Sequence, residues 1–93
     1  MSIDVRVPTV LREHTGGESK VTAQGSTLRE VIYDLETRHP GLKERLVDDS
    51  GGLHRFINLY VNDEDVRYLG GIETPTEDGD TVSILPAVAG GSS

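Results

Sequence analysis

The hydrophobic pattern of this chain changes period near residue 27, and that change constrains the fold more than any other feature. Before it, Ile3, Val5 and Val7 alternate with polar residues, which is typical of a strand with one buried face. Thr27 and Glu30 then have the spacing of a capping box, which satisfies the free amides of a helix start. The apolar positions that follow have helical spacing and are Leu28, Val31, Ile32 and Leu35. The pattern therefore predicts strand structure followed by one amphipathic helix.

Turn signals delimit the rest of the first half. A glycine turn at residues 15–18 and a short alternating run at residues 20–23 predict a β-hairpin with the first strand. The helix is expected to end at residues 39–41, where proline and glycine cannot continue it. Leu42 and Leu46 are spaced for one further helical turn.

Three more strands are expected after a polar loop at residues 48–52. The clearest of them places Ile57, Leu59 and Val61 on the core side. Turn-like residues 62–65 precede the second strand, and an acidic turn precedes the third. The expected strands are residues 56–62, 66–69 and 81–85.

The resulting order, β-β-α-β-β-β, predicts an α+β fold. We expect a roll of the β-grasp kind, in which a mixed sheet of four to five strands packs on one main helix. The length of 93 residues suits one such domain. We assign residues 1–85 to the folded domain and residues 86–93 to a flexible C-terminal tail. Other α+β topologies are compatible with the hydrophobic pattern alone.

Composition excludes several functional classes. The chain has no cysteine, so disulfides and thiolate chemistry are excluded, and a reducing, cytoplasmic location is expected. The first residues lack the charged lead and apolar run of a signal peptide, and no membrane segment is expected. The net charge of −7 argues against nucleic-acid binding and favours a basic partner surface. The three histidines lack ligand spacing, so no metal site is predicted; they are His14, His39 and His54.

The tail itself has the shape of a substrate. Residues 86–91 contain no charged side chain and can extend roughly 20 Å from the last strand, far enough to enter the active site of another protein. Gly90 and Gly91 make the end thin enough for a narrow channel. The alternative is a frayed terminus or a glycine-serine linker without function.

Several segments together resemble the ThiS/MoaD family of ubiquitin-like sulfur carriers, over nearly the whole chain up to Gly91. They are INLYVNDEDVR at residues 57–67, EDGD at 77–80 and ILPAVAGG at 84–91, in the predicted element order. Within the family, the chain most resembles the carriers of actinobacterial cysteine synthesis. That likeness rests on PTVLREHTGG at residues 8–17 and LHRF at residues 53–56.

The resemblance implies that the chain is a cosubstrate and not an enzyme, with no catalytic residue and no bound cofactor of its own. An E1-like adenylating and sulfurtransferase enzyme, using ATP and Mg²⁺, would activate the carboxyl of Gly91 and convert it to a thiocarboxylate. Val88, Ala89 and Gly90 would thread through that enzyme's channel. A sulfur-accepting synthase, PLP-dependent as in cysteine synthesis or of another type, would then take the sulfur, and a JAMM-type zinc metalloprotease would release the product.

The chain departs from the family pattern after the diglycine. Ser92 follows Gly91, so the carbonyl of Gly91 lies in a peptide bond and cannot be adenylated. We expect the bond between Gly91 and Ser92 to be a processing site for a JAMM-type protease, which would remove Ser92 and Ser93. The alternative is that the two serines are a remnant of cloning.

The outer face of the sheet is the expected docking surface. Phe56, Tyr60 and Leu85 should point away from the helix and expose apolar area to a partner. The alternative is that these side chains are partly covered and have no role in binding.

Three other functions compete with the sulfur carrier. A ubiquitin-like protein modifier would use the same activated Gly91 but form isopeptide bonds with lysines of other proteins. Chains of the protein on itself are disfavoured, because Lys20 and Lys43 are its only lysines. A small subunit of molybdopterin synthase would need a larger apolar interface. The last alternative is an interaction module with an inert tail.

Overall fold

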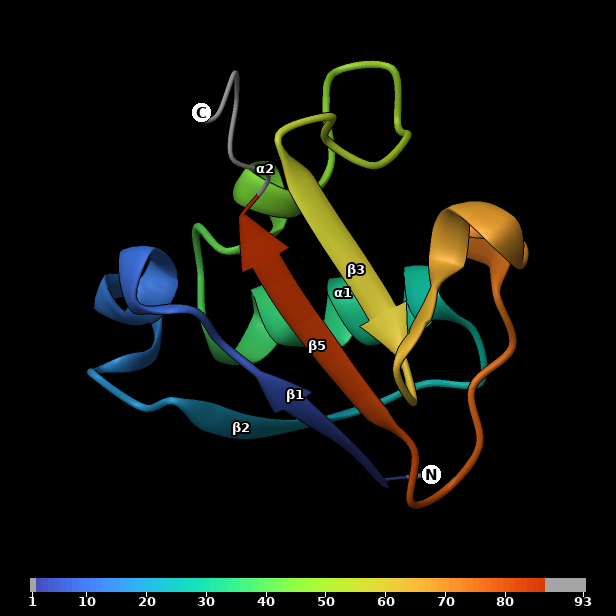
Figure 1. Ribbon diagram of the computed structural model, residues 1–93. Coiled ribbons are helices and arrows are strands. Elements are labelled where there is room, and N and C mark those ends of the chain that lie inside the picture. Colours follow the sequence, from blue (N-terminus) through green and yellow to red (C-terminus); the bar gives the residue numbers. More distant parts are fainter. Residues whose placement is uncertain (1, 87–93) are drawn as a thin grey trace.

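The structure is a computed structural model that describes residues 2–86 (Figure 1). Two strands, two helices and three further strands follow one another along the chain, with short 3₁₀ helices in the connections. In chain order they are β1 (Ser2–Arg6), η1 (Thr9–Thr15), β2 (Lys20–Gln24), α1 (Leu28–Arg38), α2 (Lys43–Leu46), β3 (Ile57–Val61), β4 (Glu64–Asp65), η2 (Val66–Tyr68), η3 (Gly71–Glu73) and β5 (Thr81–Pro86).

The strands form one mixed sheet in the order β2-β1-β5-β3-β4. The pair β1–β5 is parallel, whereas the other pairs are antiparallel. The first and last strands therefore lie side by side in the middle of the sheet, and α1 crosses one of its faces (Figure 1). This is the β-grasp arrangement, which confirms the predicted fold class.

The helix α1 begins where the capping signal predicts. The Thr27 side chain accepts a hydrogen bond from the Glu30 amide, and the Glu30 carboxylate accepts one from the Ser26 amide at 2.8 Å. All four of its predicted apolar positions are buried against the sheet. The sheet side of this core includes Ile3, Val5, Leu59, Val82 and Ile84.

The prediction of a strand at residues 66–69 is wrong. Asn62 and Asp63 both have positive φ, 51° and 73°, as in a tight two-residue hairpin turn, so the chain re-enters the sheet at once as β4. Asp65 then accepts a hydrogen bond from the backbone amide of Arg67 at 2.9 Å, and the chain bends into the 3₁₀ helix η2. The paired residues therefore lie in the segment predicted to be the turn.

Two other boundaries differ from the prediction. The β1–β2 hairpin exists, but it is closed by η1 rather than by the glycine turn alone; Gly16, with φ of 65°, ends that 3₁₀ helix. The strand β5 includes Pro86, one residue past the predicted limit of the folded domain, because Pro86 pairs with Ile57. The predicted helical turn with Leu42 and Leu46 is confirmed as α2, and both leucines are buried.

Candidate functional site

The candidate site surrounds the end of β5, where the chain leaves the middle of the sheet. The strand β5 pairs with β1 over residues 81–83 and with β3 up to its last residue, Pro86, which lies opposite Ile57. We call the surface around this point the tail base. The predicted tail and processing residues lie outside the described residues, and their roles stay predictions; they are Val88, Ala89, Gly90, Gly91 and Ser92.

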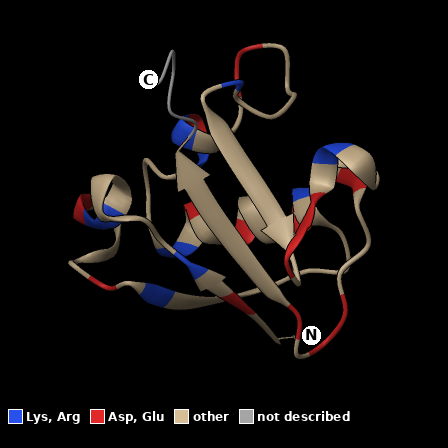
Figure 2. Ribbon diagram, viewed as in Figure 1, with Lys and Arg blue, Asp and Glu red and all other residues tan. Residues whose placement is uncertain are grey.

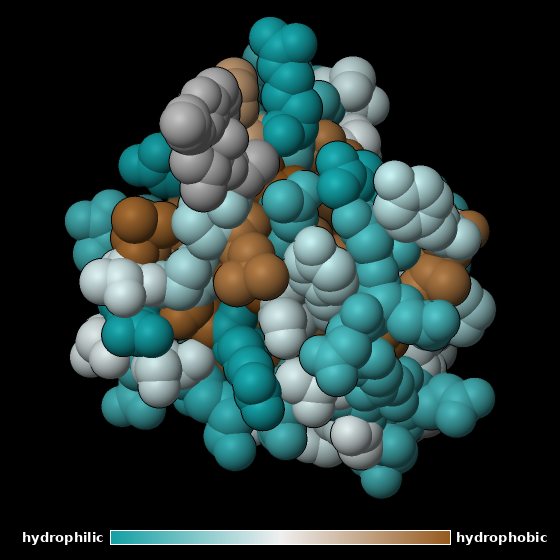
Figure 3. All heavy atoms as spheres, in the orientation of Figure 1, coloured by the Kyte–Doolittle hydropathy of each residue, from teal (hydrophilic) through white to brown (hydrophobic). Residues whose placement is uncertain are grey.

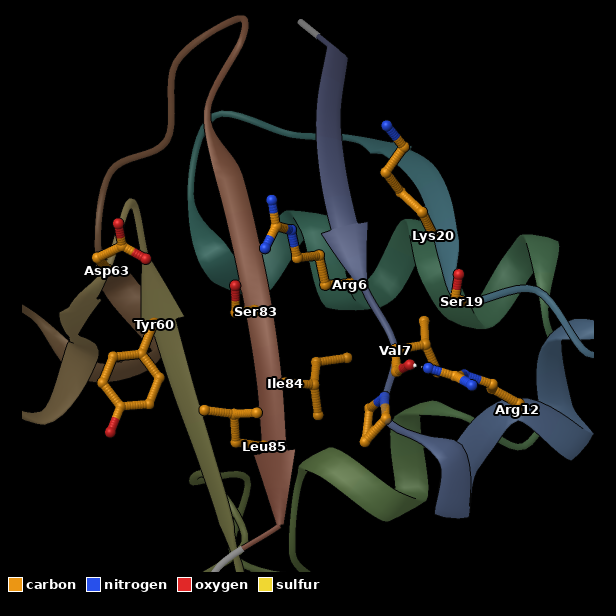
Figure 4. A pocket seen from close by; sticks show the side chains of 11 residues that line it. Arg6, Val7, Arg12, Ser19, Lys20, Tyr60, Asp63, Ser83, Ile84 and Leu85 are labelled. Carbon is orange, nitrogen blue, oxygen red and sulfur yellow. Dashed lines mark hydrogen bonds between the residues drawn. The ribbon is translucent and has the colours of Figure 1, made fainter.

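A hollow of about 580 Å³ occupies the outer face of the sheet beside the end of β5. Tyr60 of β3 and Leu85 of β5 both line it, and Figure 4 shows them on the same side of the sheet. Leu85 is 48% exposed, and Tyr60 is partly buried. Apolar side chains are visible on this face of the molecule (Figure 3). The structure thus brings together two of the three predicted docking residues.

Phe56, the third predicted docking residue, lies in a different place. It precedes β3 and lines a second hollow of about 300 Å³, together with Val10 of η1 and residues of α2. Its ring is half exposed, with the Arg55 guanidinium 5.4 Å and the His54 ring 5.5 Å from its centre. Phe56 therefore belongs to another part of the tail base than Tyr60 and Leu85.

Three basic residues, which the sequence argument did not single out, also line the outer-face hollow. Arg6 of β1 and Lys20 of β2 are exposed, and the Arg12 Nε donates a hydrogen bond to the carbonyl of Val7 at 3.1 Å (Figure 4). The outward position of Arg6 follows from strand alternation. That Arg6 lies next to Lys20 depends on the β1–β2 register, and the position of Arg12 depends on η1; neither can be seen in the hydrophobic pattern.

Charged side chains are distributed unevenly around the two ends of β5. Acidic residues cluster at the turn before its start, whereas Arg6 lies on the neighbouring strand β1 and Lys20 on β2, the next strand along the sheet (Figure 2). Asp78 and Asp80 accept hydrogen bonds from backbone amides in or near that turn, at 2.8 Å each. These two carboxylates are thus engaged at the end of the sheet away from the tail base.

Within residues 2–86, no group of three or more histidine, aspartate or glutamate side chains is arranged to hold a metal ion. The helices in that part of the chain are all too short or too polar to cross a membrane.

The chain is similar to known proteins along nearly its full length. The sequence model of the ThiS family matches residues 5–91. Sulfur carrier protein CysO of Mycobacterium tuberculosis is 59% identical over 93 residues, which cover 98% of this chain and 100% of that protein. A chain in the crystal structure of the Amycolatopsis orientalis BexX/CysO complex superposes with a TM-score of 0.90 at 61% identity, covering 96% of this chain and 99% of that one.

A more distant relative carries a different name. Small archaeal modifier protein 3 of Haloferax volcanii is 34% identical over 93 residues, covering 98% of this chain and 100% of that protein. The family match, the shared fold and the full-length identities lead to one conclusion: the chain belongs to the ThiS family.

Proposed function

We propose that this chain is a sulfur carrier and that the working group is the carboxyl of Gly91. The observation that carries the proposal is its similarity, over nearly the whole length of both chains, to a protein named as a sulfur carrier. The chain serves as a cosubstrate. Its folded domain docks on partner enzymes and presents the tail to them, and those enzymes supply the catalysis.

The chemistry requires activation of Gly91, because a carboxylate is a poor electrophile. A carboxylate oxygen attacks the α-phosphorus of ATP, and pyrophosphate leaves. Hydrosulfide, or a donor of equivalent sulfur, then attacks the acyl carbon and displaces AMP. The product is a thiocarboxylate, in which sulfur is held as a nucleophile. The first step needs ATP and Mg²⁺ in an E1-like enzyme, with no cofactor bound to this chain.

Before activation, the bond between Gly91 and Ser92 has to be hydrolysed. A carbonyl in a peptide bond carries no free oxygen anion to attack ATP. We assign this cleavage to a zinc metalloprotease of the JAMM type. Processing would then control when the carrier becomes competent.

The sulfur passes from the thiocarboxylate to a synthase that makes cysteine or another sulfur-containing metabolite. For cysteine, the acceptor would be an activated serine derivative on a PLP-dependent synthase. Tyr60 and Leu85 would contact these partners on the outer face of the sheet, and Phe56 would contact them from its own hollow. An exposed apolar patch beside a reactive chain end suits such transient docking.

A test uses two forms of the chain, one ending at Gly91 and one continuing through Ser93. Each is incubated with the E1-like enzyme of the same organism, Mg·ATP and sulfide, and both pyrophosphate and intact mass are measured. The form ending at Gly91 should release pyrophosphate and gain the mass of one oxygen-to-sulfur exchange, and the longer form should do neither. A shortened chain ending at Gly90 is the control. Absence of pyrophosphate release from the Gly91 form would contradict the proposal.

A second candidate, protein modification, is favoured by the similarity to Small archaeal modifier protein 3. A modifier would use the same acyl adenylate but transfer Gly91 to lysine amines of other proteins. An epitope-tagged chain expressed in the host distinguishes the two. Conjugates of high mass that resist thiol reagents would support a modifier. A free thiocarboxylate on the tagged chain, together with a requirement for added cysteine in a host strain that lacks the chain, would support the carrier.

A further inference from the structure

Arg6 and Lys20 lie directly opposite each other in the β1–β2 register. Residues opposite each other on antiparallel strands project their side chains from the same face, about 5 Å apart at Cβ, and like charges in such positions destabilise a sheet. Both side chains are exposed on the outer face. The free protein therefore carries a repulsive pair on one flank of the outer-face hollow.

No carboxylate within residues 2–86 forms an ion pair with Arg6, Lys20 or Arg12. Of the other six lysines and arginines among the described residues, three form ion pairs with carboxylates, and three, Lys43, Arg45 and Arg55, do not. The Nε of Arg38 lies 2.7 Å from Asp34. Similar pairs join Arg29 to Glu73 and Arg67 to Asp65. What distinguishes Arg6, Lys20 and Arg12 is that they gather around one hollow, with a single lining carboxylate, in a chain with a net charge of −7.

The position of the three cations relates them to the tail. They stand on β1, β2 and η1 along one flank of the hollow, and Leu85 at the end of β5 lies in its floor (Figure 4). The one carboxylate among the described residues that line the hollow is Asp63, which lies on the opposite flank, on the same side as Tyr60 (Figure 4). The hollow therefore lies beside the point where the chain leaves the sheet.

We propose that the outer-face hollow docks an acidic surface of the adenylating enzyme, with carboxylates placed opposite Arg6, Lys20 and Arg12. This rests on the proposed function and names the chemistry of its first partner. The enzyme already holds a triphosphate, so a strongly negative carrier is repelled unless its leading face is positive. The net charge predicts a basic partner surface, whereas the charge at the tail base predicts an acidic one.

The test compares two double variants with the same loss of charge. Arg6→Gln with Lys20→Gln removes the pair in the hollow, and Arg38→Gln with Lys43→Gln removes two cations on the helix side of the sheet. The measured quantities are the dissociation constant for the adenylating enzyme and the KM for pyrophosphate release by chains ending at Gly91. The Arg6→Gln, Lys20→Gln variant should bind about tenfold more weakly than the unaltered chain at about 0.05 M salt, and the control variant about twofold more weakly or less.

Two further readouts separate docking from a structural role. At about 1 M salt, where the Debye length is about 3 Å, the difference between the two variants should disappear. The urea midpoint of the Arg6→Gln, Lys20→Gln variant should equal or exceed that of the unaltered chain, because repulsion is relieved. Equal weakening of binding in both double variants would overturn the inference, as would a lower urea midpoint for the Arg6→Gln, Lys20→Gln variant than for the unaltered chain. If the unaltered chain ending at Gly91 releases no pyrophosphate, the proposed function fails and this inference fails with it.

Discussion

Ile57 of β3 lies opposite Pro86 of β5, and these two residues form the last pair at that end of the described sheet. Four residues, 87–90, then separate this pair from Gly91. The distance that Gly91 can reach from the folded domain is therefore limited by the position of Pro86 and by the number of residues that follow it.

Deleting Ala89 should shorten this reach by about 3.5 Å and lower kcat/KM for adenylation by about 100-fold, because the carboxyl no longer meets the α-phosphorus of ATP. Pyrophosphate release by chains ending in the diglycine measures the effect. Val88→Ala keeps the length and serves as the control. Equal rates for the deletion and the control would show that tail length is not limiting.

Leu59 and Leu85 provide a matched test of core against surface. Leu59 is 2% exposed and belongs to the core, so Leu59→Ala should cost about 2–5 kcal/mol of unfolding free energy in a denaturant titration. Leu85 is 48% exposed in the outer-face hollow, so Leu85→Ala should cost less than about 1 kcal/mol. The same Leu85 variant should weaken binding to the adenylating enzyme. Unchanged affinity would remove Leu85 from the docking surface.

Gly25 and Gly52 should respond oppositely to alanine. A Cβ on Gly25 would lie 2.7 Å from the backbone nitrogen of Val31 and 2.9 Å from the carbonyl carbon of Glu30, so helix α1 would have to shift. We expect Gly25→Ala to destabilise the fold by about 1–3 kcal/mol. Gly52→Ala meets nothing closer than 3.8 Å and should be neutral or stabilising by up to about 1 kcal/mol. Thermal unfolding of both variants checks the contrast.

The Glu36 carboxylate accepts hydrogen bonds from the backbone amides of Lys43 and Gly41, at 3.0 and 3.1 Å, and joins the end of α1 to α2. These bonds lower the pKa of Glu36 below its ordinary value of 4.5. Because the folded pKa is the lower one, this stabilisation is complete above about pH 4.5 and is lost as the pH falls through the folded pKa. Glu36→Gln should therefore flatten part of the decline in unfolding free energy that occurs below about pH 4.5, as the pH falls through the folded pKa. An identical decline in both proteins would assign it to other carboxylates.

Local signals made the helix predictable. The Thr27 cap and the apolar spacing of α1 depend on residues close in sequence, and both appear in the structure. The hairpin at Asn62 and Asp63 was misplaced because the pattern of polar residues does not reveal which two adopt positive φ. Phe56 was assigned to the outer face by extending strand alternation one residue before β3 begins.

The candidate site shows a similar division. Alternation along β3 and β5 predicted that Tyr60 and Leu85 share a face, and the structure places them in one hollow. The meeting of Arg6 with Lys20 depends on pairing between two strands, and the position of Arg12 depends on a 3₁₀ helix that no hydrophobic period marks. Net charge, which averages over the whole chain, therefore gave a different expectation for the partner than the surface around the tail.

The central position of β5 also bears on mechanical load. A pull on the chain beyond Pro86 is directed along β5, which is paired with Asp4, Val5 and Arg6 on one side and with residues 57–61 on the other. Hydrogen bonds on both flanks then share the force in shear, whereas a strand at the edge could be peeled away one bond at a time. A pull on the chain beyond Pro86 therefore loads the pairs of residues 84–86 with β3 first, and the doubly flanked residues 81–83 hold the strand in the sheet behind them.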